Sequence, residues 1–97
     1  MAVFILMRVW LLSAAMFIVI SYDISDDRRR TRVFEALKDY GTWVQYSVFE
    51  CELTSDEIAR LQAVLAELIN PREDSIRYYY LCRGCLQRCE VQGVTAR

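Results

Sequence analysis

The sequence has no histidine, a single proline and only three glycines among its 97 residues. The absence of histidine removes the commonest general base, the usual nucleophile–base pairs and most zinc sites other than all-cysteine ones. A formal net charge of −1 gives no overall attraction to nucleic acid, so any such contact needs a local basic cluster. Chemistry in this chain therefore depends on carboxylates, tyrosines, arginines, cysteines or a bound metal.

The chain is long enough for one domain. It is 55% hydrophobic and 12% aromatic, a composition that argues against disorder. A domain of this size buries a modest core and gains from oligomerisation. We therefore expect one folded domain for which association with a further subunit is favourable.

Cysteines gather near the C-terminus, where Cys82, Cys85 and Cys89 follow one another closely, while Cys51 stands apart. A zinc or redox site is the functional interpretation, and free thiols are the alternative. Zinc sites usually contain two separated ligand pairs, and only one Cys-x-x-Cys is present. The sequence therefore favours free thiols.

The first twenty residues are almost wholly apolar, interrupted by Arg8 and Ser13. They fit a signal peptide with a small-residue cleavage site at 13–15, although the charge lies inside the apolar run. They also fit a membrane helix, although Arg8 lies in its middle. The third interpretation is a gene start placed too early, with Met16 as the true initiator, and this is the one we favour.

The rest of the chain alternates between strand and helix patterns. Residues 17–23 are apolar on both faces, which predicts a central strand. A helix is predicted to follow, with Ser25 as its cap, acids in its first turn and Gly41 as its stop. Two further segments are predicted to be extended before the last helix and after it: one long strand or two short ones at 42–53, and a strand at 75–82. Between them, a helix starts at the capping box Thr54–Glu57 and ends before Asn70-Pro71. A short strand is predicted at 90–92.

This order predicts an α+β fold, a ferredoxin-like βαββαβ sandwich with two helices on one face of an antiparallel sheet. The strands are apolar or aromatic on both faces, so the sheet face without helices would be a large apolar patch. A second subunit on a twofold axis covers such a patch economically. We therefore expect a homodimer packed sheet to sheet.

Asp23 ends the first predicted strand. It is either a metal ligand or simply the start of the turn into the helix. One Asp is a poor Mg²⁺ site, but a symmetric dimer would supply Asp23 twice, and a metal there would activate water for attack on a phosphodiester. For Asp26, stabilisation of the helix dipole is the more typical role, with support of the metal as the alternative.

Basic and aromatic side chains are candidates for nucleic-acid contact. The densest basic cluster is Arg28, Arg29, Arg30 and Arg32, which would bind phosphate or form a solvated helix face beside acids. Arg77 is a weaker candidate of the same kind. Tyr22, Phe49 and the tyrosines at 78–80 would stack on bases, or lie in the core or a dimer interface.

Three segments together resemble the CRISPR-associated endoribonuclease family, the smaller protein of the universal adaptation pair. They are Ser21–Phe34 (SYDISDDRRRTRVF), Tyr40–Cys51 (YGTWVQYSVFEC) and Asp74–Cys82 (DSIRYYYLC). The segments lie in family order and spacing, and the resemblance covers about residues 16–93.

The resemblance implies a ferredoxin-like fold, a stable homodimer, and metal-dependent cleavage of single-stranded RNA or double-stranded DNA. It also implies that the dimer bridges two dimers of the CRISPR-associated integrase and holds DNA for insertion as a new spacer. The family's metal-associated Asp falls on Asp23, its basic residues in the first helix on Arg30 and Arg32, and the aromatic of its Ser-Val-Phe block on Phe49. A non-catalytic scaffold that only clamps DNA is the alternative function.

The chain departs from the family at both ends. Members usually begin almost directly at the first strand, so residues 1–15 are extra, which supports initiation at Met16. Many members have a further strand after Gly93, where only residues 94–97 remain. We expect a domain at 16–93 between an extra apolar segment and a short tail, in a cytoplasmic protein without a membrane segment. A membrane-anchored or exported protein is the competing interpretation.

Overall fold

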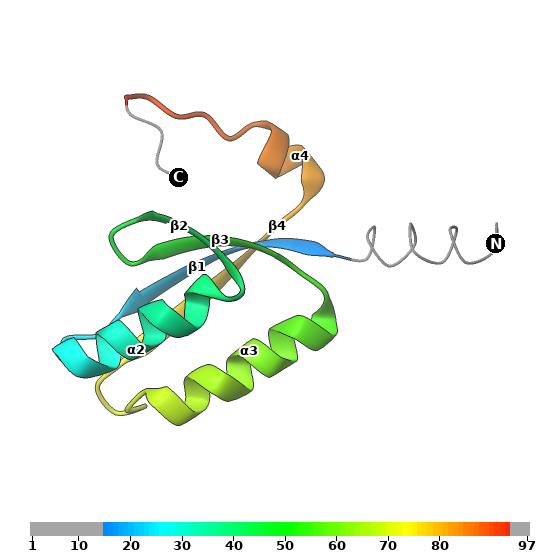
Figure 1. Ribbon diagram of the computed structural model, residues 1–97. Coiled ribbons are helices and arrows are strands. Elements are labelled where there is room, and N and C mark those ends of the chain that lie inside the picture. The colour runs from blue at the N-terminus through cyan, green and yellow to red at the C-terminus, as the bar shows by residue number, and fades with distance from the viewer. Residues whose placement is uncertain (1–14, 94–97) are drawn as a thin grey trace.

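The computed structural model describes residues 15–93, which form a four-stranded antiparallel sheet and three helices (Figure 1). The leading segment and the tail expected from the sequence lie outside this range, apart from Ala15. The strand order in the sheet is β2-β3-β1-β4. The elements are β1 (Met16–Asp23), α2 (Asp27–Lys38), β2 (Gly41–Gln45), β3 (Val48–Leu53), α3 (Ser55–Leu68), β4 (Ser75–Leu81) and α4 (Arg83–Gln87).

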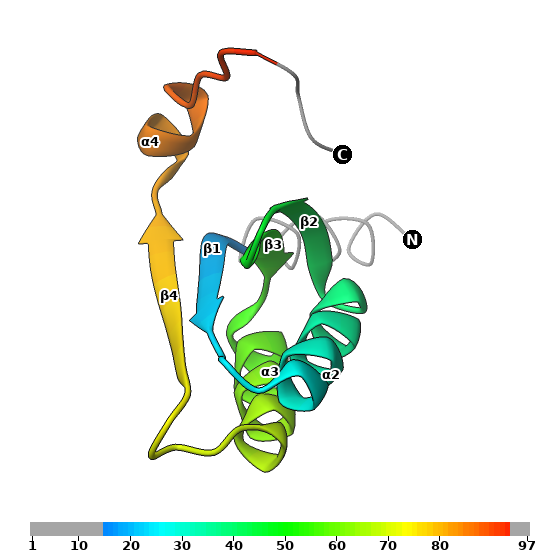
Figure 2. The ribbon, with the colours of Figure 1, turned by 90° about the vertical axis from the view of Figure 1, so that its left-hand side faces the viewer.

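Helices α2 and α3 cover one face of the sheet (Figure 2). Alternate residues of β1 and β3 point toward them, because side chains alternate between the two faces of a strand. Ile18 and Ile20 of β1 pair with Cys51 and Phe49 of β3, and all four are buried. The core is completed by Tyr22, Ile24, Val33, Leu37, Leu53, Ile58, Leu61 and Leu65.

The predicted α+β, ferredoxin-like fold is therefore confirmed for the described residues. The extended segment at 42–53 is two strands, and the turn between them contains Tyr46 with a φ of 45°. The capping box of α3 is also confirmed, since the Glu57 amide donates to Thr54 Oγ1 over 3.3 Å and the Thr54 amide donates to Glu57 Oε1 over 2.9 Å.

Two predicted helix ends are wrong. Asp26, not Ser25, caps α2, because its Oδ2 accepts a hydrogen bond of 2.9 Å from the Arg29 amide. Gly41 does not end the helix, which stops at Lys38 with Asp39 as its C-terminal cap. Gly41 instead begins β2, where a Cβ would collide with Cys51 Sγ and lie 2.5 Å from the Glu50 carbonyl oxygen.

The region after β4 also differs from the prediction. Residues 90–92 form no strand, and a short helix, α4, starts directly after Cys82. Among residues 15–93, no helix has the length and apolar character needed to cross a membrane.

Candidate functional site

The sheet face opposite α2 and α3 carries a mixed set of side chains, which we call the open sheet face. Strand alternation and the pairing register put these residues on one side of the sheet. It consists of Phe17, Val19, Ser21 and Asp23 of β1, Val48, Glu50 and Glu52 of β3, and Ser75, Arg77, Tyr79 and Leu81 of β4.

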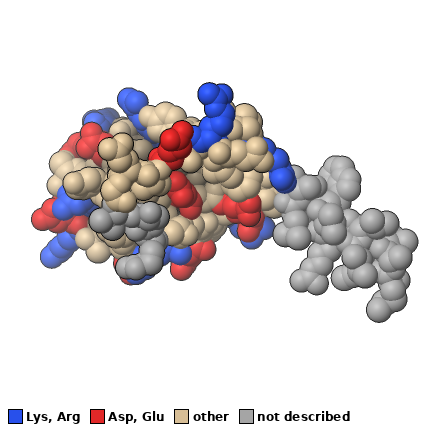
Figure 3. Space-filling model, turned by 90° about the horizontal axis from the view of Figure 1, so that it is seen from above, with Lys and Arg blue, Asp and Glu red and all other residues tan. Residues whose placement is uncertain are grey.

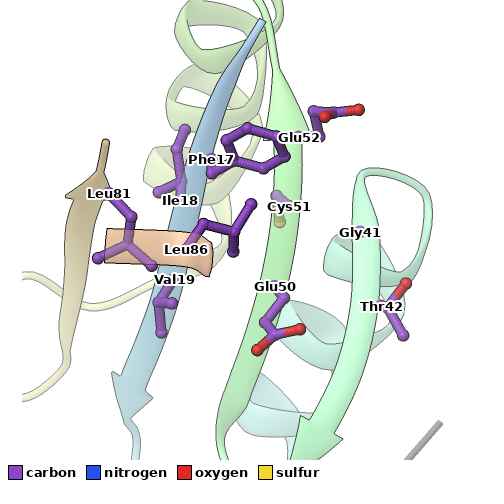
Figure 4. A pocket seen from close by; sticks show the side chains of 10 residues that line it. All are labelled: Phe17, Ile18, Val19, Gly41, Thr42, Glu50, Cys51, Glu52, Leu81 and Leu86. Carbon is purple, nitrogen blue, oxygen red and sulfur yellow. The ribbon is translucent and has the colours of Figure 1, made fainter. Parts of the chain in front are cut away.

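A hollow of about 390 Å³ lies over part of the open sheet face (Figure 4). Phe17 and Val19 form its floor, and Leu86 reaches over them from α4. Glu50 and Glu52 line the hollow from β3. Its surface is thus apolar in the middle and acidic on one side, which is unlike a phosphate site.

Asp23 lies at the far end of β1 and is exposed. It pairs with Ser75, while Ser21 pairs with Arg77, so Asp23 and Arg77 are diagonal neighbours on the open sheet face. Carboxylate oxygen is the donor that a hard cation such as Mg²⁺ prefers. Within residues 15–93, however, no three His, Cys, Asp or Glu side chains come close enough together to hold a metal. The donor type fits Mg²⁺, but the number of donors in one chain does not.

The arginine cluster separates into residues with different contacts. Arg29 forms a bidentate ion pair with Asp74, with Nε–Oδ2 at 2.7 Å and Nη2–Oδ1 at 3.2 Å. Asp74 is only 8% exposed and also accepts from the Asn70 amide over 2.8 Å. Hydrogen bonds from Arg29 hold the pKa of Asp74 below its ordinary value. Arg29 therefore joins α2 to the start of β4 rather than facing a ligand.

Arg30 forms hydrogen bonds to the loop that joins Asp23 to α2. Its Nη1 donates to the carbonyl oxygens of Ile24 and Ser25 at 3.0 and 3.3 Å, and its Nη2 pairs with the Asp27 carboxylate. The guanidinium also borders a second hollow of about 350 Å³ beside Tyr46. It thus fixes the loop that follows Asp23 while one side remains accessible.

Arg28 and Arg32 are the exposed members of the cluster. Together with Asp27 and Thr31 they line a shallow hollow on α2. No ion pair involves either arginine within the described part of the chain. These two side chains are therefore the ones most available to an anionic ligand.

Two of the predicted aromatic site residues are in the core. Phe49 is fully buried and Tyr22 is 5% exposed, with their ring centroids 6.4 Å apart. Burial raises the pKa of Tyr22, an effect that a hydrogen bond with Ser47 and the charge of Arg30 partly offset. On β4, Tyr79 is 47% exposed on the open sheet face and accepts from Arg77 Nη1 over 3.4 Å.

Acidic and basic side chains are interspersed on the side of the molecule that carries α4 (Figure 3). No extended patch of one sign appears in this view. The net charge of the whole chain is close to zero, and the charges on this face are mixed in the same way. Contact with a polyanion would therefore depend on a few individual arginines.

Sequence reasoning missed the position of Leu86, because a helix of five residues leaves little periodic signal. It also missed the pairing of Arg29 with Asp74, which lie 45 residues apart. The alternation of Glu50 and Glu52 with buried Cys51 was the signal that could have put both acids on the open sheet face.

The fold and the site define a small ferredoxin-like α+β protein with one exposed acid at the end of its central strand and arginines on the adjoining helix. The family model for CRISPR associated protein Cas2 matches residues 16–89, and the chain belongs to this family. The family resemblance of the three sequence segments is therefore confirmed.

Individual relatives agree with this assignment. The CRISPR-associated endoribonuclease Cas2 3 of Chloroflexus aurantiacus is 51% identical over 79 residues, which cover 81% of this chain and 85% of that protein. The crystal structure of Streptococcus pyogenes Cas2 at pH 6.5 has a TM-score of 0.73 and 34% identity, covering 80% of this chain and all of that one. A chain of a partial Cas6-RT-Cas1–Cas2 complex has a TM-score of 0.71 and 28% identity, covering 78% and 89%.

Proposed function

We propose that this protein forms a homodimer, binds nucleic acid, and bridges dimers of the CRISPR-associated integrase during spacer acquisition. Membership of the Cas2 family supports this role. So does the similarity to a chain from a complex that contains Cas1 and Cas2. The second part of the proposal is endonuclease activity, which the name endoribonuclease of the relatives supports. We further propose that this activity depends on magnesium and acts on single-stranded RNA or double-stranded DNA.

The open sheet face supports dimerisation. Phe17, Val19 and Leu81 are only half-buried in the single chain, and Tyr79 is 47% exposed beside them. The large apolar patch expected from the sequence is therefore reduced to a strip, because Glu50, Glu52 and Arg77 lie on the same face. Twofold pairing would bury this apolar strip in both copies.

Asp23 is the observation on which the nuclease proposal depends. It is an exposed carboxylate at the end of the central strand, and two copies would supply two such groups to one Mg²⁺. When bound, Mg²⁺ activates water and stabilises charge on phosphate oxygens. Arg30 holds the loop after Asp23 through the Ile24 and Ser25 carbonyls, so it positions the carboxylate.

Nucleic-acid contact is proposed for Arg28 and Arg32 on α2 and for Arg77 on the open sheet face. All three arginines are exposed, and a guanidinium group can bind phosphate through two parallel hydrogen bonds. Because these contacts neutralise phosphates and release counterions, binding should weaken with added salt, with a slope set by the number of phosphates contacted.

The test is cleavage of labelled RNA and DNA with and without magnesium by the wild type and by Asp23→Asn. We expect Asp23→Asn to lose at least about 100-fold in cleavage rate, since a charged carboxylate ligand of the metal would become a neutral amide on both copies. Asp56→Asn is the matched control, because Asp56 is an exposed acid in the first turn of α3, on the other layer. Equal cleavage by the wild type and Asp23→Asn would refute the nuclease part.

A DNA-clamping scaffold without catalysis is the second candidate. It is favoured by the small number of donors that each chain brings to the site, since within the described residues no group of three His, Cys, Asp or Glu side chains gathers around Asp23. In this case Asp23→Asn would support normal spacer acquisition in cells. The two assays together separate the two functions, because cleavage and acquisition are measured independently.

A further inference from the structure

Two thiols lie in contact at the start of α4. Cys82 is the residue that precedes the helix, and Cys85 follows one turn later. Their Sγ atoms are 3.3 Å apart, and both residues are exposed. A thiol pair within contact distance can close to a disulfide with a small movement of the side chains.

The two sulfurs differ in their hydrogen bonds with the surrounding backbone. The Cys85 amide points at Cys82 Sγ, with N–Sγ at 3.4 Å, and the Leu86 amide donates to the Cys82 carbonyl oxygen over 3.0 Å. The amide and thiol of Cys85 lower the pKa of Cys82, whereas the Cys82 sulfur raises the pKa of Cys85. Cys82 is thus the sulfur that carries negative charge more readily.

We propose that Cys82 and Cys85 form a redox-active dithiol that a small-molecule disulfide, such as oxidised glutathione, converts to an intramolecular disulfide. The Cys82 thiolate attacks one glutathione sulfur, forming a mixed disulfide and releasing one glutathione thiolate. Cys85 then loses its proton to solvent and attacks Cys82 Sγ, which expels the second glutathione thiolate. The protein dithiol is oxidised by two electrons, and oxidised glutathione is reduced to two glutathione molecules.

The other cysteines are less suited to this reaction. Cys51 is buried in the core at 6% exposure. Cys89 is exposed, but its Sγ lies against the Cys85 carbonyl oxygen at 3.7 Å rather than against a sulfur. The geometry therefore selects one pair among the four thiols.

The location of the dithiol gives the disulfide a structural consequence. Leu86 follows Cys85 directly and lies over Phe17 and Val19 on the open sheet face (Figure 4). A disulfide between Cys82 and Cys85 would close a covalent ring around the first turn of α4. It would thereby restrict the turn that carries Leu86, while the sheet hydrogen bonds stay unchanged.

The test treats the fully reduced protein with oxidised glutathione near neutral pH and follows its mass and its peptide map. A Cys89→Ser chain is expected to lose two hydrogen atoms and to keep no glutathione, with Cys82 and Cys85 linked in the map. The wild type is expected to give the same link. A Cys85→Ser chain should stop with glutathione on Cys82, and a Cys82→Ser chain with glutathione on Cys85.

The order of attack is tested by the two single variants. Glutathione should join Cys82 in Cys85→Ser several-fold faster than it joins Cys85 in Cys82→Ser, because the attacking species is the thiolate. Equal rates would overturn the assignment of Cys82 as the attacking thiol. Stable glutathione adducts on both Cys82 and Cys85 of one chain, or a disulfide to Cys89 instead, would overturn the dithiol itself. Both readouts are independent of nuclease activity.

Discussion

Arg29 and Asp74 show how one residue in a run of similar residues acquires a different role. The carboxylate of Asp74 is buried, and a buried charge is tolerated only when it is paired and hydrogen-bonded. Arg29 supplies two of those hydrogen bonds and the Asn70 amide a third. The arrangement holds the loop before β4 against the start of α2, close in the chain to Asp23.

We predict that Arg29→Ala lowers the melting temperature by several degrees at neutral pH, because it leaves Asp74 without its partner. The pKa of Asp74 is below its ordinary value in the folded protein, so this stabilisation is complete above about pH 5 and is lost as the pH falls through the folded-state pKa. Thermal unfolding monitored by circular dichroism at several pH values measures the difference.

Arg28→Ala is the matched control for that experiment. Arg28 is the preceding residue on α2 and is exposed, so its removal should leave the melting temperature nearly unchanged. An equal loss of stability in the two variants, or a difference that persists unchanged in acid, would contradict the role assigned to Arg29.

Cys51 is predicted to be inert in the native protein. Burial, followed by the charge of Glu50, raises the pKa of this thiol to about 11. At about pH 8 it is therefore almost entirely protonated, and alkylation requires the thiolate. Iodoacetamide should label the three exposed cysteines of the reduced native chain and reach the fourth only after unfolding. Mass spectrometry counts the adducts, and a fourth adduct forming equally fast under native conditions would disprove the prediction.

At the scale of elements, the sequence was informative where a strong local signal decides the outcome, although it put the cap of α2 at Ser25 instead of Asp26. The capping box at Thr54 and the apolar stripe of Ile58, Leu61 and Leu65 act within one helix, so their effect is visible in the chain itself. The roles of Gly41 and Arg29 depend on β3 and on Asp74, which are brought near only by folding. The mistaken stop at Gly41 has this cause, because a close backbone approach leaves no local signature.

Gly41→Ala provides a test of that explanation. The added methyl group would collide with Cys51 Sγ and the Glu50 carbonyl, so β2 must move away from β3. We expect a loss of about 1–3 kcal/mol in the free energy of unfolding, as for other overpacked positions. Chemical denaturation measures it.

Gly84→Ala is the control for the Gly41 variant. Gly84 lies in α4, where the nearest atom to an added Cβ is Cys82 Sγ at 3.9 Å. Alanine is the better helix former by about 1 kcal/mol, so this variant should be unchanged or slightly more stable. A Gly41→Ala protein as stable as the wild type would show that the close approach to β3 does not explain the glycine.

At the scale of the whole molecule, the candidate site is only partly contained in one chain. The sequence predicted Asp23 and an uncovered sheet face, and the structure has Asp23 exposed at the end of that face. The remaining ligands of a metal site would come from a second copy, from substrate and from water, and none of these is encoded next to Asp23. Tyr22 and Phe49 lie in the core, so any support they give to the site is indirect.

The pairing of two copies through the open sheet face is the claim on which the shared acid and the bridging role both depend. Val19 lies near the middle of this face, so Val19→Lys would place a charge in the proposed interface and should convert a dimer to a monomer. Val64→Lys is the matched control, because Val64 is 40% exposed on α3, in the other layer.

Sedimentation equilibrium of the wild type, Val19→Lys and Val64→Lys is the most direct measurement. For a chain of 11.4 kDa, we predict about twice this mass for the wild type and for Val64→Lys, and a single-chain mass for Val19→Lys. A wild type that sediments as a monomer, or a Val19→Lys protein that remains a dimer, would contradict the account.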